Sequence, residues 1–142
     1  MAKILSETVK SAISLKIKSN YPDVNIYKNK VKQGMKMPCF FISQIDTSQE
    51  KVSKTVYKRD YVFNIRYHID ASTRTELDEV GIDLLGILDQ LEIDKDMFFG
   101  NKLRYEIIDE VLHVFVNYSI RLVKEDEGGI PMETLDIKGG MK

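Results

Sequence analysis

Apolar and polar residues alternate most regularly over residues 55–69 and 112–122. From Tyr61 to Ile69 every second residue is aromatic or aliphatic, and the residues between them are mostly polar. A period of two is typical of a β-strand with one face on the core and the other facing solvent or a partner. Shorter apolar runs predict further strands at residues 24–27, 39–45 and 103–107. Asp109-Glu110 is a plausible tight turn before the last strand, although no glycine supplies the positive φ that such turns prefer.

Two other stretches have apolar residues at steps of three and four, which is typical of amphipathic helices. The first covers residues 3–19 and ends at Tyr21-Pro22, because a residue before proline avoids the α region. The second covers residues 74–91 and opens with Thr73 and Glu76 in the form of a capping box. Gly81 and Gly86 each cost about 1 kcal/mol of helix propensity relative to Ala. We expect both glycines to let a strand or a helix approach closely.

The predicted order of elements is α-β-β-β-α-β-β, and the predicted fold class is α+β. A single mostly antiparallel β-sheet with two α-helices packed on one face buries both helical stripes in two layers. We assign residues 1–124 to this domain, with residues 46–53 as a loop or hairpin tip and residues 94–101 as a connection. Residues 125–142 are rich in acidic residues and glycine, and are predicted to be a flexible C-terminal tail. Its apolar residues leave open that part of it docks on a neighbour: Ile130, Met132, Leu135 and Ile137.

Charge and composition exclude several classes of protein. The net charge is −1, from 21 Lys+Arg against 22 Asp+Glu, which is not the basic surplus of a nucleic-acid-binding domain. The chain has no apolar run long enough to cross a membrane and lacks the apolar region of a signal peptide. The single cysteine excludes an internal disulfide and suits a reducing compartment. We therefore expect a protein that is made in, and stays in, the cytoplasm.

Residues capable of chemistry are few. His68, His113 and Cys39 could form a metal site or a Cys/His pair, but none of the usual ligand spacings is present. Cys39 begins an apolar strand, where a free cysteine is usually a buried structural residue. No glycine-rich phosphate loop or nucleophile elbow occurs either. The sequence therefore predicts no catalytic residue, no cofactor and no metal. A small cytoplasmic binding or catalytic domain built on these three residues remains the alternative from a different class.

A basic loop precedes the strand that begins at Cys39. Lys28, Lys30, Lys32 and Lys36 follow one another at short intervals, next to Tyr27. This loop has three interpretations: a solvated loop, a contact to nucleic acid, or a charged rim that meets an acidic protein surface.

Three segments together resemble a known family. They are VKQGMKMPCFFI at 31–42, YKRDYVFNIRYHID at 57–70 and GNKLRYEIIDEVLHVFVNYSIRLVK at 100–124. In order and spacing they are similar to the tail terminator proteins of bacteriophages and prophage-like elements in Gram-positive bacteria. The resemblance covers roughly residues 1–125. It implies an α+β fold and a structural, non-enzymatic protein that forms a ring, usually of six copies, on the head-proximal end of the tail tube. Such a ring stops tube growth and offers the surface to which the head or neck joins.

The resemblance also implies partners and a location. The expected partners are other copies of the chain, the tail tube protein, a neck or head-completion protein and possibly the sheath, with no membrane and no direct nucleic-acid readout. The protein would assemble in the bacterial host cytoplasm and end in the virion tail. Another head–tail joining or tail-completion protein is the alternative from the same class. The predicted interface lies on the exposed loops and on the polar face of the 55–69 strand: Lys30, Lys32, Gln33, Lys36, Thr47, Gln49, Lys51, Asn64, Arg66 and His68.

Overall fold

The computed structural model describes residues 4–28, 34, 36–70 and 73–124. The predicted tail, residues 125–142, therefore lies outside the described residues. Two helices and six strands follow in the order α1 (Ser6–Asn20), β1 (Asn25–Tyr27), β2 (Cys39–Lys51), β3 (Val56–His68), α2 (Arg74–Ile87), β4 (Gln90–Ile93), β5 (Asp96–Ile108) and β6 (Val111–Val123).

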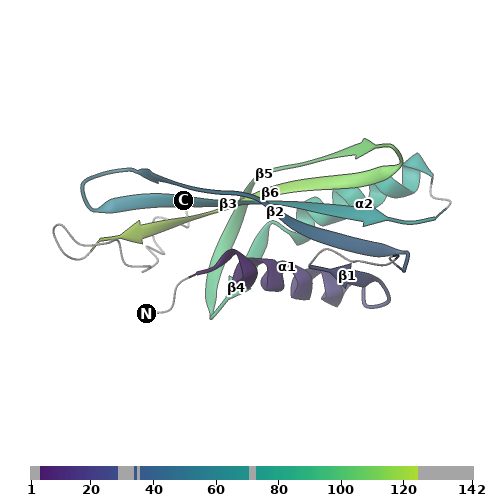
Figure 1. Cartoon of the computed structure of the whole chain (residues 1–142), viewed down its shortest axis with the longest axis horizontal. Helices are drawn as coiled ribbons and strands as arrows, with labels where there is room; N and C mark the ends of the chain where they lie inside the picture. Colours follow the sequence, from purple (N-terminus) through teal and green to yellow (C-terminus); the bar gives the residue numbers. More distant parts are fainter. Residues whose placement is uncertain (1–3, 29–33, 35, 71–72, 125–142) are drawn as a thin grey trace.

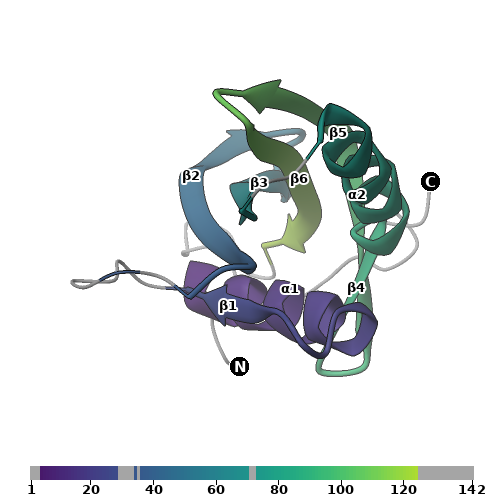
Figure 2. The same ribbon diagram turned by 90° about the vertical axis from the view of Figure 1, so that its right-hand side faces the viewer.

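The strands form one sheet in the order β1-β2-β3-β6-β5-β4. β1 runs parallel to β2, and every other neighbouring pair is antiparallel. The sheet is strongly curled, and both helices lie on its concave side (Figures 1 and 2). The predicted α+β class, with a mostly antiparallel sheet and two helices on one face, is confirmed.

The helices close the curl over one core. α1 buries Val9, Ile13 and Ile17 and contacts both β2 and β4, so it bridges two strands that lie far apart in the sheet order. α2 packs on β5 and β6. Its predicted N-cap is confirmed, since the Thr73 hydroxyl accepts a hydrogen bond from the Glu76 backbone N–H at 3.1 Å.

The two helix glycines differ. A Cβ built at Gly81 would lie 2.9 Å from the ring of Tyr105 on β5, so the predicted close approach is confirmed there. At Gly86 such a Cβ would meet nothing within 4 Å, and the same prediction is wrong. The sequence shows two small residues but not which face of α2 each one occupies.

Residues 46–53, predicted to be a loop or hairpin tip, lie mostly in a strand, and only Val52 and Ser53 belong to the hairpin turn. β2 continues to Lys51, which pairs with Tyr57, and the turn is confined to residues 52–55. The register shifts between Gln44 and Asp46. Backbone pairing with β3 holds this part of β2 although its side chains are exposed on both faces, and so no alternation marks it as a strand.

Residues 94–101 are not a simple connection either. α2 ends at Ile87, a short strand β4 follows, and β5 already begins at Asp96. Asp94 and Lys95 form the turn with positive φ values of 51° and 71°. Leu91 and Phe98 are buried and pair with each other, whereas helical spacing alone made Leu91 look like part of α2. The predicted turn at Asp109 and Glu110 is confirmed: it has φ values of 49° and 64° without any glycine.

Candidate interaction surfaces

The convex face of the sheet carries no helix in the part of the chain that the structure describes (Figure 2). The residues that alternate with the core positions of β3 and β6 face this side, which we call the open face. Two arginine–aromatic pairs lie on it. The Arg66 guanidinium carbon lies 5.1 Å from the centroid of the Phe41 ring, and that of Arg104 lies 4.1 Å from the centroid of Phe115. In each pair the guanidinium makes a cation–π contact with the ring and stays partly accessible to a partner.

Both histidines belong to this open face but are not opposite each other. Arg66 is paired with His113, and His68 is paired with Cys39. Burial lowers the pKa of both imidazoles, and the nearby Arg66 cation lowers each further. Both are therefore neutral at pH 7. Among the described residues no group of three or more His, Cys, Asp or Glu side chains could hold a metal ion.

Cys39 has the character of a structural thiol. Its side chain is fully buried, and burial raises its pKa, so the nucleophilic thiolate is disfavoured. The three residues on which a catalytic or metal site would depend thus offer a protonated thiol and two neutral imidazoles.

A polar network crosses three strands at the middle of the open face. Asp60 on β3 accepts hydrogen bonds from the Asn117 amide at 3.2 Å and from the Ser119 hydroxyl. Asn117 also donates to Asn101 on β5 at 3.0 Å, and Asn101 donates to Ser119 at 2.9 Å. Asn117 is only 6% exposed. Sequence reasoning missed this network because its members meet only through the strand register.

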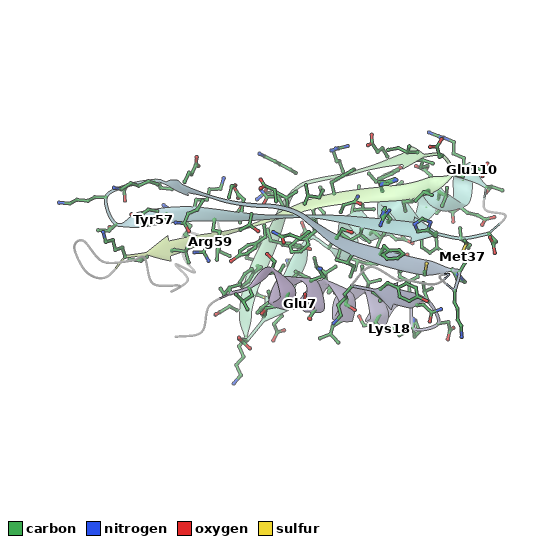
Figure 3. The ribbon with its side chains drawn as sticks, in the orientation of Figure 1. Glu7, Lys18, Met37, Tyr57, Arg59 and Glu110 are labelled. Atoms are coloured by element: carbon green, nitrogen blue, oxygen red, sulfur yellow. The ribbon has the colours of Figure 1, made fainter. Side chains whose placement is uncertain are left out.

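Beyond the network, the β2–β3 hairpin continues past the helices as a projecting arm, which comprises residues 45–60 (Figure 1). Every residue from Ile45 to Lys51 is exposed, including Ile45 at 52%. Figure 3 shows Tyr57 and Arg59 at this end, far from Met37 and Glu110 at the other. The Arg59 guanidinium ties the two strands together by donating to the Gln49 side-chain oxygen at 3.0 Å.

The structure divides the predicted interface residues between two surfaces. Thr47, Gln49 and Lys51 lie on the arm, opposite residues of β3 that face the helix side of the sheet. Arg66 and His68 lie on the open face and are partly exposed, while Asn64 is buried at 9% exposure and offers little contact area. Lys36 is exposed at the end of the basic loop. Lys30, Lys32 and Gln33 lie outside the described residues.

Comparison with known protein families decides between a structural tail protein and a small binding or catalytic domain. Residues 8–130 match the family described as phage tail terminator protein. The chain belongs to the phage tail terminator family. Tail terminators are structural components of phage tails, not enzymes.

Other comparisons add little to this assignment. No curated protein matches the sequence. One solved structure, 11% identical, covers 87% of this chain and 99% of its own with a TM-score of 0.42, a likeness too low to support a conclusion. Neither helix in the described part of this tail terminator is long and apolar enough to cross a bilayer.

Proposed function

We propose that this tail terminator forms a hexameric ring that caps the head-proximal end of the tail tube. The ring stops the addition of tube subunits and presents the surface to which the neck or head-completion protein joins. In a contractile tail the ring also meets the last turn of the sheath. Assembly takes place in the host cytoplasm, and the ring remains in the virion tail. The observation that carries the proposal is the projecting arm, on which every β2 residue from Ile45 to Lys51 is exposed.

The arm suits contact between neighbouring subunits. A ring is a heterologous assembly, so each subunit needs two different complementary patches. β1 pairs only with Cys39–Phe41, and no other strand of the described residues flanks that side of β2. The remainder of β2 therefore presents a long strand edge, which is a ready template for another chain. We assign the arm, with Thr47, Gln49 and Lys51, to the contact with the next subunit.

The open face suits a different partner. Arg66, which lies over the Phe41 ring, favours an acidic protein surface, whereas Arg104 already has an ion pair with Glu106 at 3.7 Å. The polar network of the face pairs the Asn117 amide nitrogen with Asp60 and Asn101, while the buried Asn117 side-chain oxygen has no hydrogen-bond partner among the described residues. We assign this face, together with Lys36 and the basic loop, to the tail tube.

The test uses charge changes on the arm and matched changes elsewhere. Purified protein is added to growing tail tubes, and tube length and ring caps are scored by negative-stain electron microscopy. The arm variant is Thr47→Arg with Glu50→Lys. The control is Thr75→Arg with Glu79→Lys, because these residues are also exposed but lie on α2.

We expect wild type and the α2 control to cap tubes, whereas the arm variant, equally stable, leaves tubes uncapped and over-long. Failure of the wild-type protein to cap tubes would refute the function. Normal capping by the arm variant would refute the role of the arm.

A further inference from the structure

β4 and the turns on either side of it are acidic. They carry four exposed or partly exposed carboxylates and a single cation, Lys95. None of the four carboxylates has an ion pair within the part of the chain that the structure describes. We call these four residues the β4 patch: Asp89, Glu92, Asp94 and Asp96. Uncompensated like charges on one edge of the subunit favour a basic partner surface.

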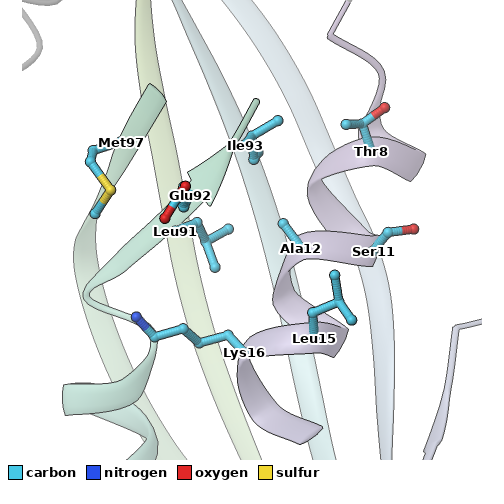
Figure 4. A pocket seen from close by; sticks show the side chains of 9 residues that line it. All are labelled: Thr8, Ser11, Ala12, Leu15, Lys16, Leu91, Glu92, Ile93 and Met97. Atoms are coloured by element: carbon cyan, nitrogen blue, oxygen red, sulfur yellow. The ribbon is translucent and has the colours of Figure 1, made fainter. Parts of the chain in front are cut away.

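An apolar groove of about 430 Å³ lies beside the β4 patch, between α1 and the β4–β5 hairpin (Figure 4). Leu15 lines its helix side and is 73% exposed, and Met97 lines its sheet side and is 43% exposed. Lys16 and Glu92 line the same groove, so its rim carries one charge of each sign. An apolar centre with a charged rim is the usual make-up of a protein–protein contact.

The tip of the arm has the opposite charge. Lys51 and Lys54 are exposed there, and neither has an ion pair with another described residue. Val52 lies between them and is 50% exposed. The backbone N–H groups of Val52 and Ser53 both donate to the Val56 carbonyl, at 2.8 and 3.1 Å, so the turn is held in place. The tip thus presents one apolar side chain between two lysines.

We propose that the arm tip of one copy docks on the β4 patch and the groove of the next copy. Val52 enters the groove between Leu15 and Met97, and Lys51 and Lys54 lie beside the carboxylates of the patch. This inference rests on the ring proposed above and names the second of its two patches, because a heterologous contact needs a receiving surface that differs from the arm.

The position of the two surfaces requires a second copy. Figure 1 shows the arm tip at one end of the molecule and β4 below its middle, beside α1. The arm is held away from β4 by its pairing with β3, and β3 in turn pairs with β6 along its whole length. The tip therefore cannot reach the β4 patch of its own subunit. Contact between two distant surfaces of one chain is heterologous and closes into a ring when its rotation allows.

The minority charges of the two surfaces agree with this pairing. Glu50 is the acid next to Lys51 on the arm, and Lys16 is the lysine at the rim of the groove. With Val52 in the groove, Glu50 can lie beside Lys16 while the lysines of the tip lie beside the carboxylates. Glu50→Lys on the arm would then weaken the contact, although it makes the arm more basic.

An exchange of charge between the two surfaces tests the contact in the full-length protein. Lys51→Glu with Lys54→Glu makes the arm tip acidic, and Asp89→Lys with Glu92→Lys makes the β4 patch basic. Each pair of changes sets like charges against each other, so we expect the concentration for half-maximal tube capping to rise at least about tenfold.

The chain with all four changes has opposite charges facing each other again. We expect it to cap tubes within about threefold of the wild-type concentration, which a merely destabilising set of changes would not allow. The control Thr75→Arg with Glu79→Lys, on α2, stays at the wild-type concentration. Wild-type capping by either pair of changes, or no recovery in the chain with all four, would overturn the inference.

Paired cysteines test where the tip lies. Val52→Cys and Met97→Cys are combined, and the protein is oxidised mildly after it has capped tubes. The native Cys39 is fully buried and does not interfere. We expect disulfide-linked multimers on a non-reducing gel. The control pairs Val52→Cys with Ile82→Cys, which is 58% exposed on α2, and should stay uncrosslinked.

A disulfide within one chain, or no disulfide on capped tubes, would overturn the inference. If wild type caps tubes but charge exchange and crosslinking both fail, the proposed function stands and only this contact is removed. Failure of wild type to cap tubes would instead refute the function itself.

Discussion

The two halves of the β2–β3 hairpin have the same backbone pairing and very different surroundings. Near the helices, Phe40, Ile42, Phe63 and Ile65 are buried under α1 and α2. On the arm, after the register shift between Gln44 and Asp46, the same two strands continue to the Lys51–Tyr57 pair with all of β2 exposed. Backbone pairing therefore continues the hairpin where β2 no longer contributes to the core, although Tyr57 on β3 still packs against the core.

The largest predicted difference between the halves is in stability. Phe63→Ala removes a fully buried ring and should cost about 3–5 kcal/mol of unfolding free energy, since a cavity remains in the core. Ser48→Ala on the arm should change it by less than about 0.5 kcal/mol. Urea unfolding of the purified protein measures both values. Comparable losses at the two sites would mean that the arm belongs to the core.

The polar network lies where the two halves meet. Asp60→Ala removes the carboxylate that accepts hydrogen bonds from the Asn117 amide and the Ser119 hydroxyl. Because Asn117 is buried, water cannot fully replace that carboxylate as an acceptor. We expect a loss of about 1–3 kcal/mol in the same assay. The matched Asp46→Ala, at an exposed arm residue, should be nearly neutral. A neutral Asp60→Ala would show that the network does not stabilise the junction.

The contrast between the buried and the exposed half of the hairpin also explains which strands the sequence could predict. Where a strand has one covered face, as from Tyr61 to Tyr67, alternation of side chains revealed it. Where neither face is covered, as on the arm, the signal vanished and β2 was predicted too short. The interface residues were chosen by polarity, which cannot show that Asn64 is buried or that Thr47 and Arg66 belong to different surfaces. Register, which the sequence does not specify locally, decides both.

A smaller change in unfolding free energy is expected at the glycines of α2, and it tests how tightly this helix packs on the sheet. Gly81→Ala places a methyl group 2.9 Å from the Tyr105 ring, whose hydroxyl is held by Asp78, so the ring cannot move freely. We expect a loss near the lower end of the about 1–3 kcal/mol that overpacking costs. Gly86→Ala has open space and should gain up to about 1 kcal/mol from helix propensity. Thermal unfolding of the two variants distinguishes them by sign, and equal shifts would contradict the packing described here.

The smallest predicted effect is a pH dependence confined to the inner half, because both histidines of the chain lie there and the arm has none. Burial lowers the pKa of His68, and Arg66 and His113 lower it further. The unfolded chain therefore binds the proton first as the pH falls below about 6.5, and the folded state loses stability until its own lower pKa is reached. His68→Gln cannot titrate, so its stability should fall less than that of wild type between pH 7 and pH 5. Urea unfolding at each pH measures the difference, in which the carboxylates common to both proteins cancel. If the stabilities of wild type and His68→Gln fell equally with pH, His68 would be as well solvated in the folded protein as in the unfolded chain. The open face around His68 would then be as accessible to water as the arm.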